Sequence, residues 1–207
     1  MKLYTYEPAP NPRRLGLFIK HKGISIDTQA IDMMTKAQFS DSFCAINPRS
    51  TLPTLVLDDG TVLTDTIAIC LYLDGLHPEK PLFGRNDLER AQVIGRCHQI
   101  FFEGFSAVAE VLRNKGEAFK DRPLPGPLKM PQIPALIDRG NLRIGAFYET
   151  MNQELTGRDF LVGNKLSQAD IDLYVTLGFS GWVKRQIPDN CPVLQNWFSG
   201  MKTRFGE

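Results

Sequence analysis

The sequence has few cysteines and histidines, and it spaces them far apart. They are Cys44, Cys70, Cys97, Cys191, His21, His77 and His98. No two cysteines form the C-x-x-C pair of a dithiol enzyme, and no group has the ligand spacing of a zinc site. We therefore expect four reduced cysteines and no bound metal.

The sequence also lacks an excess of charge and a long apolar run. With 24 Lys and Arg against 23 Asp and Glu, the net charge is +1, which offers little of the counterion release that drives nucleic-acid binding. No segment has about 18 consecutive apolar residues, and residues 1–14 contain no apolar stretch of the kind a secretory signal needs. We expect a cytoplasmic protein that binds neither nucleic acid nor membrane.

The amino-terminal part predicts a strand, a helix and a second strand. Residues 2–6 alternate and are rich in aromatic side chains, which strands favour. After a proline-rich turn, Asn11 is predicted to cap a helix that has Pro12 as its first residue and ends at Gly23. A strand near residues 24–31 would close a right-handed βαβ unit.

A polar helical stretch over residues 35–43 is followed by a predicted hairpin. Residues 54–57 and 61–64 form short apolar strands, and the Asp-Gly pair at 59–60 supports the positive φ that a tight turn needs. A helix follows, and three residues can cap it: Thr64, Asp65 and Thr66.

Beyond a turn-rich segment at residues 75–81 the strand signals stop, and we place a domain boundary there. Residues 87–114 show one long helical pattern. Five prolines interrupt residues 123–134, too many for regular structure. Helical spacing resumes over 135–155.

The last part of the chain contains a sharp helix start. Ser167 and Asp170 have the spacing of a capping box, which predicts a helix from Gln168. The remainder is expected to form short helices broken at Pro188 and Pro192.

Taken together, this order of elements and motifs resembles the cytosolic glutathione transferases. The motifs are Leu52-Pro53 before the hairpin, Thr64-Asp65-Thr66-Ile67-Ala68-Ile69 at the next helix start, and Phe160-Leu161-Val162-Gly163 before Leu166-Ser167-Gln168-Ala169-Asp170. The resemblance implies an α/β thioredoxin-like domain (βαβαββα) over residues 1–76 that binds glutathione. It also implies an all-α domain over 87–207 with a hydrophobic pocket for an electrophile. The stretch Ala-Pro-Asn-Pro-Arg-Arg at 9–14 is similar to that of a group of bacterial transferases.

Glutathione has two carboxylates, one ammonium group and a thiol, and the resemblance suggests residues for the charged groups. Thr66 lies at a helix start, where free N–H groups and the helix dipole favour a carboxylate. Asp65 could pair with the ammonium group, in place of the Glu or Gln that the family usually has there. The alternative is that both residues only cap the helix.

The resemblance also implies contacts for the rest of glutathione. Pro53 corresponds to a cis-proline that leaves the backbone N–H and C=O of Leu52 free for the cysteinyl part. Gln38 corresponds to a histidine that lies near the glycyl carboxylate in a related class, although an isolated glutamine is more often a solvated helical residue.

The group that stabilises the thiolate departs from the family pattern. Ala9 occupies the position at which many classes have a serine and some a cysteine, so no hydroxyl is present there. Asn11 could donate its side-chain N–H to the sulfur, assisted by the helix N-terminus, or it could serve only as an N-cap. Tyr6 is the competing donor, or a packing aromatic. Arg13 and Arg14, in the first turn of the helix, suggest an anionic neighbour or are ordinary surface arginines.

For the electrophile, four aromatic residues are candidates: Phe101, Phe102, Phe105 and Trp182. The proline-rich 117–134 segment could border their pocket. Aromatic residues at helical spacing are more often core, so no single one of them is selected.

The expected function is that of a glutathione transferase, with glutathione as co-substrate and no metal. The thiol of glutathione would ionise near Asn11 and attack an apolar electrophile by substitution or addition, and the same thiolate could reduce peroxides. The alternative is a non-catalytic glutathione-binding or protein-interaction module of the same fold. The family generally forms two-fold dimers, so we expect a homodimer.

Overall fold

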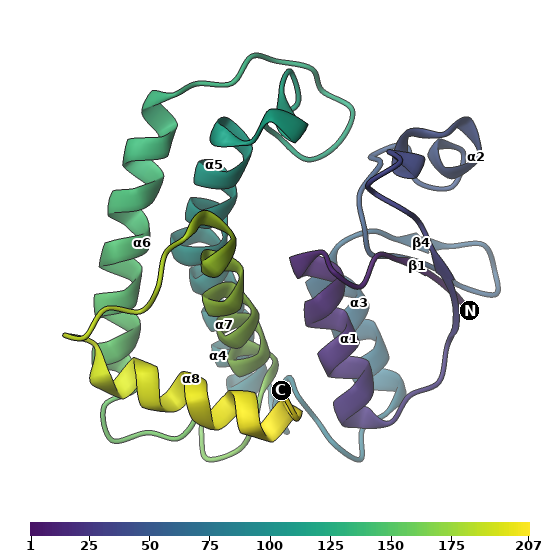
Figure 1. Cartoon of the computed structure of the whole chain (residues 1–207). Coiled ribbons are helices and arrows are strands. Elements are labelled where there is room, and N and C mark those ends of the chain that lie inside the picture. Colours follow the sequence, from purple (N-terminus) through teal and green to yellow (C-terminus); the bar gives the residue numbers. More distant parts are fainter. The chain divides into compact units, whose positions relative to one another are not determined.

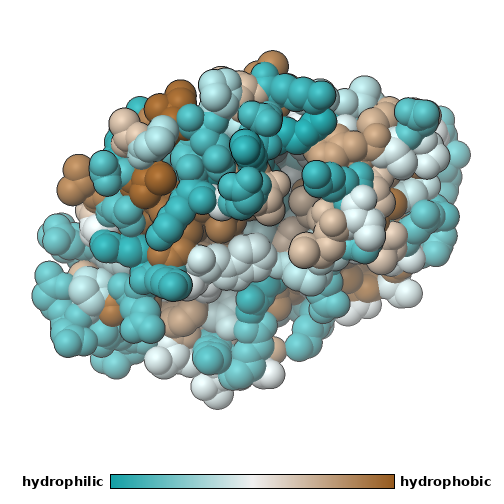
Figure 2. Space-filling model, turned by 45° about the horizontal axis from the view of Figure 1, so that its top comes forward, coloured by the Kyte–Doolittle hydropathy of each residue, from teal (hydrophilic) through white to brown (hydrophobic).

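The computed structural model describes residues 1–207, which form two compact units. Unit 1 comprises Met1–Lys80 and Leu124–Met130, and unit 2 comprises Pro81–Pro123 and Pro131–Glu207. Figure 2 shows apolar side chains scattered among polar ones on the face that it draws. None of the helices combines the length and the apolar character of a membrane span.

A four-stranded mixed sheet is the centre of unit 1, with strand order β2-β1-β3-β4. The strands are β1 (Lys2–Thr5), β2 (Asp27–Ala30), β3 (Thr54–Val56) and β4 (Val62–Leu63). β1 and β2 are parallel, whereas β3 is antiparallel to both β1 and β4. The predicted hairpin is confirmed, and Gly60 in its turn has a φ of 86°, which glycine adopts without steric cost.

Two helices, α1 (Pro10–Lys22) and α3 (Thr66–Leu76), pack against each other beside the sheet (Figure 1). Lys22 of α1 is buried and pairs with Asp74 of α3 at 2.5 Å, and it also donates to the Lys80 carbonyl. A buried charge needs such partners, since removing one of them leaves the other uncompensated.

The predicted start of α1 is wrong by two residues. Ala9, not Asn11, is the N-cap, and it makes no side-chain capping bond. The helix can begin at Pro10 because proline has the φ of a helix and needs no N–H at the first position, and because the Arg13 N–H already bonds to the Ala9 carbonyl at 2.9 Å. The predicted stop at Gly23 is confirmed, with a left-handed φ of 72°.

The polar stretch at 35–43 forms two short helices and not one. They are η1 (Ala37–Phe39) and α2 (Asp41–Cys44). Ser40 between them is extended, and its hydroxyl caps α2 by accepting from the Phe43 N–H at 3.3 Å.

Unit 2 is all helical. Its helices are α4 (Asp87–Gln99), η2 (Ile100–Phe105), α5 (Ser106–Lys115), η3 (Glu117–Phe119), α6 (Ala135–Glu154), α7 (Gln168–Ser180), η4 (Gly181–Val183) and α8 (Pro192–Phe205). The predicted long helix is present as α4, η2 and α5, but η2 is a π-helical turn, which hydrophobic spacing does not reveal. Pro192, predicted to break a helix, instead begins α8, because proline fits the first turn.

The capping box before α7 is confirmed. Asp170 accepts from the Ser167 N–H and hydroxyl and from the Leu161 N–H, at 2.7–2.8 Å. Nearly every side chain of α7 is buried, so this box starts the central helix of unit 2.

Candidate functional site

Most of the predicted site residues lie at one edge of the unit 1 sheet. Because β3 is antiparallel to β1 and to β4, and β2 is parallel to β1, three strands end where β3 begins. We call this end of the sheet, where β1, β2 and β4 finish and β3 begins, the carboxyl edge. Continuing the paired register, in which Tyr4 faces Thr54 and Leu55 faces Leu63, leads to Tyr6, Leu52 and Asp65 at that edge.

The segment before β3 has the backbone geometry expected of it. The Leu52-Pro53 bond is cis, as predicted. Both residues are buried, and Leu52 packs in a small cluster with Ile31 and Phe43. The backbone N–H and C=O of Leu52 precede β3 and make no hydrogen bond within the protein, so they remain able to pair with an extended peptide.

Tyr6 packs against the same cluster, which agrees with its interpretation as a packing aromatic. Its backbone carbonyl accepts from the Ala9 N–H at 2.9 Å, and this bond turns the chain from β1 into α1.

The amino-terminal turn of α1 presents Asn11. Arg14 Nη1 donates to Asn11 Oδ1 at 2.9 Å, and Arg14 is only 3% exposed, so it is not a surface arginine. Arginine can only donate, which requires the amide oxygen to face it and the amide NH2 to face away. Pro10 and Pro12 have no N–H and that of Arg13 is bonded to Ala9, so the Asn11 N–H is the one open backbone donor of this turn.

The start of α3 has a similar arrangement. Asp65 is the N-cap, and its Oδ1 accepts from the Ile67 and Ala68 N–H groups at 2.9 and 3.2 Å. This confirms the capping role and leaves the second carboxylate oxygen unused. Ile69 bonds back to the Asp65 carbonyl, so the N–H of buried Thr66 is the open backbone donor of α3. A carboxylate is favoured at such a position.

Gln38 lies on η1, after β2, and it is 7% exposed rather than solvated. Its side-chain Oε1 is buried and has no partner. Its backbone carbonyl lies 3.9 Å from the Cys44 thiol. This unpaired oxygen shows that the hydrogen bonds of the Gln38 amide are not all made within the protein.

Unit 2 brings three of the four candidate aromatic residues into one row. Phe101 stacks on Phe105 (5.4 Å between ring centroids), Phe105 contacts Phe179 (5.1 Å), and Phe179 contacts Trp182 (5.5 Å). The exposed ends of this aromatic row are Phe101 and Trp182, at 45% and 54%. Phe102 does not join it and stacks on His98 instead. The sequence pattern misses Phe179, because that pattern follows one helical stripe and Phe179 comes from α7.

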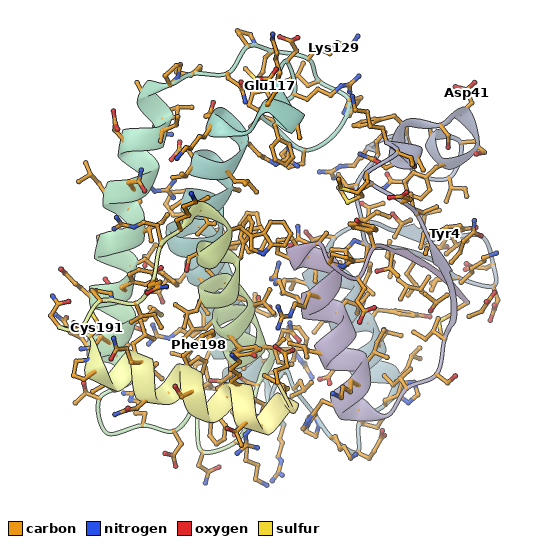
Figure 3. All side chains as sticks on the ribbon, viewed as in Figure 1. Tyr4, Asp41, Glu117, Lys129, Cys191 and Phe198 are labelled. Carbon is orange, nitrogen blue, oxygen red and sulfur yellow. The ribbon has the colours of Figure 1, made fainter.

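The cysteines and a cavity in unit 2 add no further group to this site. All four cysteines are free, and burial, together with the charge of Glu149, raises the pKa of the Cys191 thiol at the start of α8 (Figure 3). The cavity, of about 390 Å³, is lined by Gln92, Gly95, Arg96, Gln99, Arg158, Leu161, Val162 and Gly163. None of the predicted site residues lines it. No group of side chains suits a metal ion.

A mixed sheet with a cis-proline before β3, followed by an all-helical unit, defines a thioredoxin-like domain joined to a helical domain. Residues 9–76 match the model of the glutathione S-transferase N-terminal domain, and residues 129–204 match that of the glutathione S-transferase C-terminal domain. The chain therefore belongs to the glutathione S-transferase family.

Similar proteins include one from a yeast and two from bacteria. Glutathione S-transferase 2 of Saccharomyces cerevisiae is 26% identical over 223 residues, which cover 99% of this chain and 86% of that protein. A glutathione S-transferase domain-containing protein of Marinobacter aquaeolei has a crystal structure with a TM-score of 0.87 and 28% identity, covering 99% of this chain and 98% of that one. A Gtt2-class glutathione S-transferase of Vibrio parahaemolyticus has a TM-score of 0.82 and 27% identity, covering 99% and 94%.

Proposed function

We propose that this protein is a glutathione transferase. It binds glutathione at the carboxyl edge, stabilises the thiolate and directs it at an apolar electrophile. The observation that supports this most is the meeting of two helix N-termini at that edge. Each has one open backbone N–H, at Asn11 and at Thr66, and the unpaired backbone of Leu52 lies at the same edge.

The charged groups of glutathione have matching partners in this arrangement. One carboxylate binds at the Thr66 N–H, where the α3 dipole stabilises it. The unused oxygen of Asp65 accepts from the ammonium group, while its other oxygen stays on the helix. The cysteinyl backbone pairs with Leu52, and the Gln38 amide donates to the glycyl carboxylate.

The thiolate is stabilised at the start of α1. The Asn11 amide NH2 donates to the sulfur, and the dipole of α1 adds to this effect. The thiol proton leaves to solvent, and the sulfur lone pair forms a bond to the electrophilic carbon. In substitution the leaving group departs with its bonding electrons, and in addition the product carbanion takes up a proton. Toward a peroxide, the same thiolate would attack one peroxide oxygen and break the O–O bond, releasing an alcohol and leaving a sulfenic acid on glutathione. A second glutathione would then displace water from that sulfur and give glutathione disulfide.

The aromatic row of unit 2 supplies an apolar surface for the electrophile. Its two exposed rings, Phe101 and Trp182, lie at the two ends of the row, and exposed aromatic surface of this kind favours an apolar or aromatic ligand. The co-substrate is glutathione, and the proposed thiolate attack needs no metal. We also propose a homodimer in the cytoplasm.

Ultraviolet titration of the thiolate of bound glutathione, with calorimetry on the same sample, tests the proposal. A transferase lowers the thiol pKa well below the value of about 8.5 for a free cysteine. Binding without a pKa shift would favour the alternative, a non-catalytic glutathione-binding module, which the alanine at position 9 supports. Absence of binding would contradict both functions.

A further inference from the structure

The long helix of unit 2, formed by α4, η2 and α5, changes its backbone hydrogen-bond pattern in η2. The N–H of Ser106 donates to the carbonyl of Phe101, five residues earlier. An α-helix would pair that N–H with Phe102, four residues earlier, so the Phe102 carbonyl loses its usual donor. Single π-helical turns of this kind are rare and occur frequently at functional sites.

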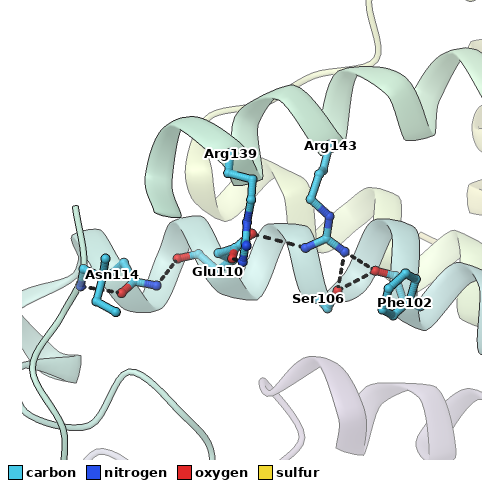
Figure 4. Close-up of polar contacts among 7 residues, drawn as sticks. Phe102, Ser106, Glu110, Asn114, Arg139 and Arg143 are labelled. Carbon is cyan, nitrogen blue, oxygen red and sulfur yellow. Dashed lines mark hydrogen bonds and ion pairs between the residues drawn. The ribbon is translucent and has the colours of Figure 1, made fainter. Parts of the chain in front are cut away.

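Two side chains replace the missing donor (Figure 4). The Ser106 hydroxyl donates to the Phe102 carbonyl at 2.5 Å, and Nη2 of Arg143, on α6, donates to the same oxygen. Arg143 Nη2 also donates to the Ser106 hydroxyl at 2.9 Å. The carbonyl that the π-helical turn leaves without a helical partner is therefore satisfied from a neighbouring helix.

Arg143 is itself held in place. Its Nη1 lies 3.2 Å from Glu110 Oε2, and the Glu110 side chain is only 9% exposed. Arg139 pairs with the other oxygen of Glu110 but does not reach Phe102. Gly104 lets α6 approach closely, since a Cβ there would lie 2.6 Å from the Phe147 ring.

The π-helical turn also determines which aromatic side chain faces the row. A π-helical turn contains one residue more than an α-helical turn, so it changes the rotation between the residues before and after it. Phe101 stacks on Phe105 in the aromatic row, whereas Phe102 lies under the Arg143 guanidinium, 5.6 Å from its ring centroid. Arg143 thus contacts both the carbonyl and the ring of Phe102, which lies outside the aromatic row.

We propose that Arg143 is a positioning residue for the electrophile: by donating to the Phe102 carbonyl it fixes the π-helical turn and holds Phe101 at the end of the aromatic row. This inference rests on the proposed function of the row. Arg143 acts through the turn and does not touch the electrophile itself.

The test compares Arg143→Met with Arg139→Met, which loses the same Glu110 partner without affecting Phe102. Two readouts are used. The first is KM for a nitroaryl chloride and for glutathione, with kcat. The second is quenching of Trp182 fluorescence by unreactive nitrobenzene, for which Trp182→Phe protein gives the background. The second readout does not depend on turnover.

For Arg143→Met we expect KM for the nitroaryl chloride, and the nitrobenzene concentration for half-quenching, to rise roughly three- to tenfold, the effect of one ordinary hydrogen bond. KM for glutathione and kcat should stay unchanged. Arg143→Lys, which keeps one charged donor, should recover part of the loss. If Arg143→Met fails to fold, Ser106→Ala removes the other donor and is judged by the same quenching.

The inference is overturned if Arg143→Met behaves as wild type in both readouts, or if Arg139→Met reproduces its effects. A wild-type protein without transferase activity would contradict the proposed function. In that case, Arg143-dependent quenching would still support the positioning of the aromatic row, so the two failures are distinguishable.

Discussion

Buried Arg14 donates to the side-chain oxygen of Asn11 at 2.9 Å within the first turn of α1. A guanidinium has no acceptor, so this bond sets the orientation of the Asn11 amide and directs its NH2 away from Arg14. An asparagine side chain that would otherwise be free to rotate is thereby held as an oriented donor at a helix N-terminus. The sequence contains both residues at i and i+3 spacing, but burial of the arginine appears only in the fold.

The role of Asn11 as the donor to the thiolate can be tested with one truncation and one isosteric change. Asn11→Ala removes the donor, and Asn11→Asp keeps an oxygen for Arg14 but places negative charge near the sulfur. We expect the thiol pKa of bound glutathione to rise by about one unit in Asn11→Ala, the equivalent of one hydrogen bond to a charged group. It should rise further in Asn11→Asp, and turnover near neutral pH should fall in the same order.

Glutathione affinity should change little in either Asn11 variant, because the bond is to the sulfur and not to the charged ends. Ultraviolet titration and calorimetry measure the two quantities separately. An Asn11→Asp protein with the wild-type thiol pKa would rule out this residue as the thiolate donor.

Asp65 has two separable roles, and two substitutions distinguish them. Asp65→Asn keeps the oxygen that caps α3 but loses the charge, whereas Asp65→Ala loses both. Both should weaken glutathione binding by a factor of about two to five, typical of one exposed ion pair. Only Asp65→Ala should lower the free energy of unfolding, by about 0.5–2 kcal/mol.

The control ligand for the Asp65–ammonium pair is glutathione without its α-amino group. It should bind equally to wild-type protein and to Asp65→Asn, because the ammonium partner is then absent from both complexes. If Asp65→Asn instead binds ordinary glutathione as tightly as wild type does, Asp65 is only a cap.

The open N–H of Thr66 can be removed with little other change. Proline is favoured at the first position of a helix, and Asp65 before it has the extended backbone that proline requires, with φ −105° and ψ 136°. Thr66→Pro should therefore fold and yet weaken glutathione binding. Thr66→Val, which retains the N–H, should keep most of the affinity. Equal affinities of the two variants would contradict the carboxylate position at this helix start.

Local chemistry explains which parts of the fold could be predicted from the sequence. The Asp-Gly turn, the Gly23 stop and the box at Ser167 each need particular residues at fixed spacing, and all three are confirmed. The sequence predicts that α1 begins at Pro12 after an Asn11 cap, because asparagine caps well, yet Pro10 allows the helix to begin two residues earlier. The pattern over residues 87–114 predicts one α-helix, because apolar residues recur at helical spacing both before and after the π-helical turn.

The site depends on contacts between distant residues, which spacing does not contain. The meeting of Tyr6, Leu52 and Asp65 at one edge follows from strand order. Phe101 and Trp182 are joined through Phe105 and then Phe179, and Phe179 belongs to a different helix. Family resemblance supplied the site residues, whereas their geometry comes only from the packed structure.

Asp170, in the Ser167–Asp170 capping box, makes the free energy of unfolding depend on pH. Burial raises the pKa of its carboxyl above the ordinary 3.8, against hydrogen bonds from Leu161 and Ser167 that lower it. The folded protein therefore holds the Asp170 proton more tightly than the unfolded chain does. The stability that this proton contributes is fully present below about pH 3.8 and is lost as the pH rises through the raised pKa.

Asp170→Asn cannot ionise, and its NH2 faces either the Leu161 N–H or both Ser167 donors. We expect it to lower the free energy of unfolding near neutral pH by roughly 1–3 kcal/mol, the cost of buried donors left unpaired. The advantage of wild type over Asp170→Asn should be larger in acid and decline with rising pH. Urea unfolding across the pH range measures it, with the exposed Asp159→Asn as control. An advantage that instead grew with pH would mean that the hydrogen bonds outweigh burial at this carboxylate.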